Sequence, residues 1–281
     1  MAVGMKDIKN RIKSVESTMQ ITKAMELVAS SKLRKAKEKT EKSKPFFDTM
    51  YNTMKQIANT TNDFSSSYVR SGEIKTSGYI IIGGDKGLAG GYNANLFRRS
   101  EAHLKGKKAK LVVVGKKAIE YFEKKGYDIA YKFPDFAETM DFVQANQLAA
   151  VVLELFDKGE IDDLTLIYTE FVSALTQNVQ VKKLLPLYIE KEDHEYKAVV
   201  YDPSPTAVFD SIIPIYLEGV LYAAVLEAFA SEQGARRTAM EAANDNAKEM
   251  IEQLNLLYNR ARQANITQEL SEIVSGAEAL K

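Results

Sequence analysis

The sequence predicts an α/β domain placed between two long helices, which pair as an antiparallel coiled coil and form a shaft that projects from the domain. A heptad pattern of apolar residues runs along each end of the chain, and each pattern indicates a long helix. Between them, short runs of β-branched residues alternate with helical segments, as in βαβ units. We therefore expect a coiled-coil helix over residues 1–60, an α/β domain over 75–200 and a second coiled-coil helix over 205–281.

The N-terminal helix is predicted from a stretch without Pro or Gly between Met5 and Lys44. Mostly apolar or small residues recur in it at alternating steps of four and three, which defines the contact line of a coiled coil. This line consists of Ile8, Ile12, Val15, Met19, Thr22, Glu26, Ala29, Leu33 and Ala36. Ile21, Met25 and Val28 form a second apolar line beside it, so we expect the helix to contact partners on more than one side.

The central region is predicted to form a sheet of parallel strands. Two short β-branched runs, Gly78–Gly83 and Lys110–Gly115, are typical of strands that are buried on both faces. Helical segments over Ala118–Lys125 and Met140–Phe156 alternate with the strands, and Leu164–Val172 continues the pattern as a further strand. This alternation indicates βαβ connections.

The second long helix is predicted to begin after Tyr201, where Ser204 is suited to cap the first turn and Pro205 to occupy the first helical position. Its contact line consists of Leu221, Val225, Ala228, Glu232, Ala235, Ala239, Ala242, Asn246, Met250, Leu254, Leu257 and Ala261. Consecutive steps of four around Met250 locally relax the supercoil. A helix over residues 215 to about 275 would be ~90 Å long, whereas a globule of this chain length is ~50 Å across. The helix therefore has to project.

Charge and composition fit this arrangement. Residues 1–44 contain 12 Lys plus Arg and 5 Asp plus Glu (+7), whereas 215–281 contain 6 and 10 (−4), so antiparallel pairing brings opposite charges together. The whole chain has a net charge of +0, which disfavours a protein that coats nucleic acid. It has no cysteine, which excludes disulfides and thiolate chemistry. The apolar runs are shorter than the ~20 residues of a membrane span, and no signal sequence is expected, so any membrane role should be peripheral.

The residues match no pattern of a catalytic site. The glycine-rich segment 83–91 follows a predicted strand, but neither the Walker pattern nor G-x-G-x-x-G fits it, so its glycines are predicted to form a tight turn. The 2 histidines, His103 and His194, lack metal-ligand spacing. The basic run 32–44 is predicted to be a solvated helix face. Two alternatives stay open: a nucleotide-binding enzyme that dimerises through its coiled coil, and a coiled-coil tether at a membrane surface.

Three separated sets of residues resemble the gamma subunits of F-type (rotary) ATP synthases. The N-terminal set consists of Ile8–Ile12, Ile21–Glu26 and Val28–Lys32, and the central set of Asp85–Leu88 and Gly90–Asn93. The C-terminal set consists of Ala230–Gln233, Arg236, Asp245–Asn246, Ile266–Glu269, Glu272–Ile273 and Gly276–Ala277. The sets occur in the family's order, so the resemblance spans nearly the whole chain. Gly84 and Ala89 stand where the family often has Ser and Cys, and neither change removes a catalytic group.

The resemblance implies a Rossmann-like α/β domain and a central rotor shaft with no catalytic site, metal or cofactor of its own. It implies that proton flow turns a membrane c-ring and the shaft with it, and that the shaft drives ATP synthesis or hydrolysis at alpha/beta catalytic sites. The implied partners are the alpha and beta subunits of a hexameric ring, the epsilon subunit and the c-ring, with no nucleic acid and no directly bound nucleotide. The implied location is peripheral, on the cytoplasmic face of the bacterial cell membrane.

The resemblance also implies contact residues. By the family pattern, Arg236, Gln263 and Thr267 meet catch loops of the beta subunits, while Lys23 and Met25 face their lever segments. The alternative for each of them is an ordinary surface position on the coiled coil.

Overall fold

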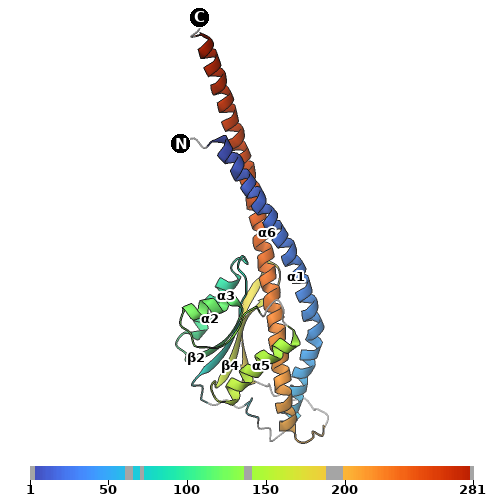
Figure 1. The fold of residues 1–281 in the computed structure, drawn as a ribbon. Coiled ribbons are helices and arrows are strands. Elements are labelled where there is room, and N and C mark those ends of the chain that lie inside the picture. Colours follow the sequence, from blue (N-terminus) through green and yellow to red (C-terminus); the bar gives the residue numbers. More distant parts are fainter. Residues whose placement is uncertain (1–3, 61–65, 70–72, 136–140, 188–198, 279–281) are drawn as a thin grey trace. The chain divides into compact units, whose positions relative to one another are not determined.

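The computed structural model describes residues 4–60, 66–69, 73–135, 141–187 and 199–278 (Figure 1). Its elements in chain order are α1 (Met5–Thr60), β1 (Ser77–Ile82), α2 (Tyr92–Leu104), β2 (Ala109–Val114), α3 (Lys116–Lys124), β3 (Ile129–Phe133), α5 (Phe142–Asp157), β4 (Asp163–Phe171), β5 (Gln177–Leu185) and α6 (Pro205–Glu278). An α/β domain and a coiled coil of the two terminal helices confirm the predicted fold class. By its contacts the chain forms two compact units, Met1–Val28 with Arg237–Lys281, and Ala29–Arg236.

The first unit is an antiparallel coiled coil of α1 and α6, drawn in blue and red in Figure 1. The contact line predicted on α1 is confirmed, because its members are less exposed than their neighbours. Ile8 is buried, and the half-buried members in this unit are Ile12, Val15, Met19, Thr22 and Glu26. Ile21 and Val28 of the second apolar line are 60% and 54% exposed, whereas Met25 is half-buried, so part of this line is open to a partner.

The contact line predicted on α6 was wrong in part between Ala239 and Leu257, whereas its members Leu254 and Ala261 are less exposed than their neighbours, as predicted. Ala242, Asn246 and Met250 are exposed. The line that faces α1 instead consists of Met240, Asn244, Ala247, Ile251, Leu254, Tyr258 and Ala261. Upstream, Ala228 and Glu232 are buried as predicted, so the run of four-residue steps lies between Ala228 and Asn244 rather than around Met250.

The second unit contains a 5-stranded sheet in the order β3-β2-β1-β4-β5. The predicted strands β1, β2 and β4 are confirmed, and β1 pairs in parallel with both of the others. β3 and β5 were not predicted: β3 is parallel to β2, whereas β5 is antiparallel to β4. β5 lies at the edge of the sheet and is largely half-buried or exposed, so its sequence, QNVQVKKLL, lacks the apolar run of a central strand.

Helices cover both faces of this sheet. Tyr79 and Ile81 of β1 pack with α2 and α3 on one face. Ile80 and Ile82 pack on the other face, where the core also contains residues of α5, α6 and α1. Successive residues of a strand point to opposite faces, which explains why β1 is apolar throughout.

The start of α6 follows the prediction. The Ser204 hydroxyl accepts a hydrogen bond from the Ala207 N–H at 3.2 Å, and Pro205 is the first helical residue. In the described part of the chain, one helix, α6, is long enough and apolar enough to cross a membrane, judged by length and composition alone. The mean hydropathy of its most apolar stretch is 1.7. Half of that stretch is buried in the protein, and a core helix passes the same test.

Candidate functional site

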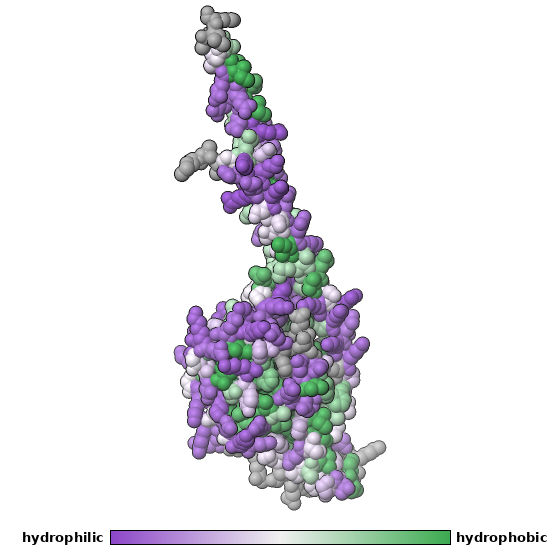
Figure 2. All heavy atoms as spheres, in the orientation of Figure 1, coloured by the Kyte–Doolittle hydropathy of each residue, from purple (hydrophilic) through white to green (hydrophobic). Residues whose placement is uncertain are grey.

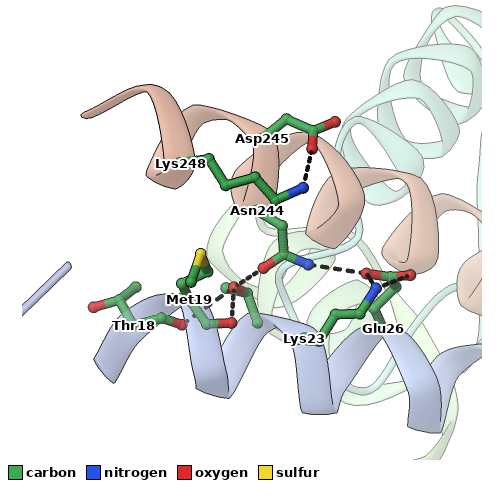
Figure 3. Close-up of polar contacts among 8 residues, drawn as sticks. Thr18, Met19, Lys23, Glu26, Asn244, Asp245 and Lys248 are labelled. Carbon is green, nitrogen blue, oxygen red and sulfur yellow. Dashed lines mark hydrogen bonds and ion pairs between the residues drawn. The ribbon is translucent and has the colours of Figure 1, made fainter. Parts of the chain in front are cut away.

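A polar cluster interrupts the apolar contact line of the first unit (Figure 3). The Thr22 hydroxyl donates to Asn244 Oδ1 at 2.5 Å, and Asn244 Nδ2 donates to Glu26 Oε2 at 2.9 Å. Lys23 Nζ lies 3.1 Å from the same Glu26 oxygen. A polar residue in the contact line of a coiled coil fixes the register of the helices, so Asn244 fixes the register of α6 relative to α1.

A shallow groove of about 450 Å³ lies beside this cluster. Its lining residues are Met19, Gln20, Lys23, Ala24, Leu27, Asn244 and Lys248. Leu27 is 62% exposed, and the Lys23 side chain is 59% exposed. Two ion pairs lie in the described part of this unit, Lys23–Glu26 and Lys248–Asp245, and each joins residues of the same helix. Among the described residues, packing and the hydrogen bonds of Asn244 therefore hold the two helices together.

The last turns of α6 form an exposed surface with an apolar side. Every described side chain after Ala261 is exposed. Four large apolar residues of this segment are 49%, 58%, 68% and 58% exposed: Ile266, Leu270, Ile273 and Val274. Figure 2 shows such apolar side chains in green beside hydrophilic ones near this end of the helix. A contiguous apolar surface of this kind marks a site of contact with other chains.

Gln263 and Thr267 are also exposed in this segment, one turn apart on α6. The Thr267 hydroxyl donates to the Gln263 backbone carbonyl at 2.9 Å. This hydrogen bond leaves the Gln263 amide group at the surface, where it can meet a partner.

Arg236 lies in the second unit and is buried rather than exposed. Its side chain is 8% exposed and forms an ion pair with Glu232 Oε1 at 2.6 Å. The same Nη2 atom donates to the backbone carbonyls of Gly87 at 3.1 Å and Lys86 at 3.3 Å. Burial raises the pKa of the Glu232 carboxyl group, and Arg236 opposes this rise. The contact of Arg236 with a beta subunit stays a prediction, and its guanidinium is engaged within the chain.

The glycine-rich loop between β1 and α2 packs against α6 at this point. A Cβ atom on Gly84 would lie 3.0 Å from Glu232 Cδ, so glycine allows this close approach. The Gly84 N–H donates to Asn93 Oδ1 at 3.0 Å. The backbone then turns through Leu88 and Gly90, which have φ values of +60° and +55°. Leu88 is 66% exposed despite this strained conformation.

The predicted site residues are divided between the two units. Lys23 and Met25 lie on α1 and Gln263 and Thr267 on α6 of the first unit, while Arg236 lies in the second. Sequence reasoning missed Asn244 because it placed Asn246 in the contact line. The spacing of Asn244 from Met240 and Ala247, four and three residues, is the signal that would have found it.

No metal centre is found in the part of the chain that the structure describes, where no group of three His, Cys, Asp or Glu could hold an ion. His103 lies against the ring of Tyr79, with ring centroids 5.7 Å apart, and Lys107 Nζ is 3.4 Å from its Nδ1 atom. Burial, together with the charges of Lys107 and Arg99, lowers the pKa of His103. His194 lies outside the described residues.

Comparison with known proteins places the chain in a family. A family model described as ATP synthase matches residues 4–280. The chain is 50% identical to the ATP synthase gamma chain of Ruminococcus albus over 97% of both chains. It is 44% identical to the sodium ion specific ATP synthase gamma chain of Acetobacterium woodii over 100% of both.

Solved structures show the same fold. A chain of the Euglena gracilis mitochondrial ATP synthase has a TM-score of 0.71 at 19% identity, with 98% of this chain and 94% of that chain covered. A chain from the central stalk and c-ring of the Tetrahymena thermophila mitochondrial ATP synthase has a TM-score of 0.62 at 23% identity, with 79% and 99% covered. With the full-length relatives, these observations establish that the chain belongs to the family of ATP synthase gamma chains.

Proposed function

We propose that this chain is the central rotor-stalk (gamma) subunit of an F-type ATP synthase. In this role it couples proton-driven rotation of the membrane c-ring to conformational change and ATP synthesis or hydrolysis at the alpha/beta catalytic sites. The observation that carries the proposal is the 50% identity to an ATP synthase gamma chain over 97% of both chains. The exposed apolar end of α6 supports it, because such a surface requires other chains to cover it.

The chain acts through contact rather than catalysis. As it turns, each beta subunit meets a different side of the long helices, and the polar pair Gln263 and Thr267 differs chemically from the apolar residues Ile266 and Ile273. Each rotor angle therefore favours one beta conformation through differential contacts. A difference of ~1.4 kcal/mol between two such contacts changes a population ratio about tenfold.

The proposed partners are the alpha and beta subunits, the epsilon subunit and the c-ring, and the proposed location is peripheral, at the cytoplasmic face of the bacterial membrane. We propose the proton as the coupling ion. A relative at 44% identity is named as sodium ion specific. Dependence of ATP synthesis on a sodium gradient in reconstituted vesicles would therefore contradict the proton and leave the rotor role intact.

Four of the predicted contact residues suit this role. Lys23 lines the groove beside Asn244, Met25 is half-buried two residues further along α1, and Gln263 and Thr267 are exposed on α6. We propose that Lys23 and Met25 face the lever segments of the beta subunits and that Gln263 and Thr267 meet their catch loops. Arg236 is set apart from these four by its burial.

The test is reconstitution with alpha and beta subunits and the membrane sector, using the double variant Gln263→Ala/Thr267→Ala. Alanine keeps the helix, so the complex should assemble while ATP synthesis falls severalfold. The matched control is Asn265→Ala/Glu269→Ala, a second exposed pair one turn apart on a different side of α6. Equal synthesis rates for the two variants would contradict the contact assignment, and failure of the wild-type chain to assemble with alpha and beta subunits would contradict the rotor role.

A further inference from the structure

The loop of residues 84–90 is held by neighbours from several parts of the second unit. Asp85 Oδ1 accepts hydrogen bonds from the backbone N–H groups of Lys116 and Asp135, both at 2.9 Å. The Lys117 N–H donates to the Gly84 carbonyl at 3.0 Å. These bonds join the first half of the loop to the N-terminus of α3 and to the segment after β3. They leave the carbonyls of Lys86 and Gly87 to be satisfied by another donor.

Arg236 provides that donor from α6. Its Nη2 atom donates to Glu232 Oε1 and to both loop carbonyls, so the two hydrogens of this nitrogen are shared among three acceptors. A lysine side chain is one bond shorter than that of arginine, so a lysine ammonium would end short of the position of Nη2. Glu232 is 4% exposed and Arg236 is 7% exposed, so both charges depend on each other for compensation.

The bonds to Arg236 lie next to the strained part of the loop. Leu88 directly follows Gly87 and combines a φ of +60° with a side chain that is 66% exposed. The Leu88 side chain therefore gains little burial in return for its strained backbone. Contacts made by its neighbours have to hold the conformation.

We propose that Arg236 is a positioning residue that clamps the loop of residues 84–90 to α6 and thereby fixes the position in which Leu88 is presented at the surface. Glu232 orients the guanidinium, and Gly84 allows the loop to approach Glu232 closely. The clamp is a property of this chain alone, whereas its effect on ATP synthesis rests on the proposed function. This assignment differs from the family-based one, in which Arg236 contacts a beta subunit.

The first experiment uses the full chain without any partner subunit. Because the chain has no cysteine, Leu88→Cys gives a single site for a nitroxide label. We expect Arg236→Lys to increase the mobility of this label and to raise hydrogen exchange of the segment 84–92 about tenfold or more, because the shorter side chain does not place its charged donor at the two loop carbonyls. Arg237→Lys is the matched control, since none of the bonds to Glu232 or the loop involves Arg237. Equal label mobility and exchange in the two variants would overturn the proposal.

A second pair of variants guards against a general loss of structure. Glu232→Gln keeps the side-chain length but removes the charge that orients Arg236, so we expect a smaller rise in label mobility. In Arg236→Ala, millimolar guanidinium should restore the low mobility of the label by filling the vacated position, which a merely unfolded loop would not allow. An absence of rescue in a folded Arg236→Ala chain would count against the clamp.

The assembled complex separates the clamp from the rotor role. If Arg236→Lys lowers ATP synthesis and also frees the loop, the clamp is supported. If it lowers ATP synthesis while the loop remains as rigid as in the Arg237→Lys control, Arg236 acts through a beta subunit and the clamp is refuted. Neither result depends on the outcome of the Gln263→Ala/Thr267→Ala test.

Discussion

Gly115 lies between β2 and α3, where a side chain would collide with the backbone of Gly83, the residue that follows β1. Its φ is +96°, and a Cβ atom there would overlap the Gly83 carbonyl. We expect Gly115→Ala to lower the free energy of unfolding by about 3 kcal/mol, because both strain and overpacking oppose it. Gly126→Ala is the control: it has a φ of +74° but open space around it, so it should cost only about 1–2 kcal/mol. Urea denaturation measures the free energy of unfolding of both variants. Equal decreases in the two would show that the chain relieves the steric overlap at Gly115.

His103 gives the chain a dependence of stability on pH. Burial is the largest cause that lowers its pKa below the ordinary value of 6.5. The folded state thus favours the neutral ring, while the unfolded chain takes up a proton near the ordinary value. The free energy of unfolding should therefore fall as the pH drops below about 6.5. Thermal melts between about pH 7.5 and 5.5 should show a smaller decrease for His103→Asn than for wild type, and parallel decreases would contradict this.

At the scale of the elements, Asn244 determines how α6 is aligned with α1. Asn244→Ala removes the partner of Thr22 and Glu26 and should lower the free energy of unfolding by about 1 kcal/mol, measured with urea. Asn244→Leu should keep the helices paired but permit more than one register. Nitroxide labels on Ser17→Cys and Glu249→Cys should then give a broader distance distribution than in the chain with Asn244. An unchanged, narrow distribution would show that the apolar contacts alone fix the register.

The two long helices were predictable to different extents. On α1, Ile8, Ile12 and Val15 are apolar and their neighbours are mostly charged, so one contact line stands out. On α6, alanines occur both in the predicted contact line and in the observed one. Asn244 is polar and yet buried, although an apolar pattern predicts an exposed residue at that position. Hydrophobic periodicity cannot choose between two lines of small residues, and it also cannot show that a buried amide has found partners on another helix.

Prediction of the sheet and of the contacts of Arg236 was limited, because both depend on contacts between residues that are distant in the sequence. The β1 and β2 runs are apolar because both of their faces are covered, which makes them visible in the sequence. β5 lies at an edge and mixes polar with apolar residues. Arginine is ordinarily exposed, and the partners of Arg236 at Lys86 and Gly87 lie 150 and 149 residues away in the sequence. No local pattern predicts that they meet.

For the molecule as a whole, we expect no binding of ATP to the isolated chain. The loop after β1 directs the carbonyls of Lys86 and Gly87 to Arg236, and the Gly84 N–H is bonded to Asn93, whereas a phosphate loop presents N–H groups to its ligand. Isothermal titration calorimetry of the lone chain with ATP and Mg²⁺ should give no heat of binding at micromolar concentrations. A saturable signal would revive the nucleotide-binding alternative.

The exposed end of α6 also affects how fast the chain is degraded before it assembles with its partners. After Ala261 no described side chain of this helix is buried, so the segment gains no protection from the rest of the chain. In a free copy, Ile266 and Leu270 are open to chaperones, to other unfolded chains and to proteases. In the complex that we propose, the alpha and beta subunits cover the same residues. Cellular turnover would thus remove surplus copies and spare those that have joined a complex, which matches the supply of this subunit to that of its partners.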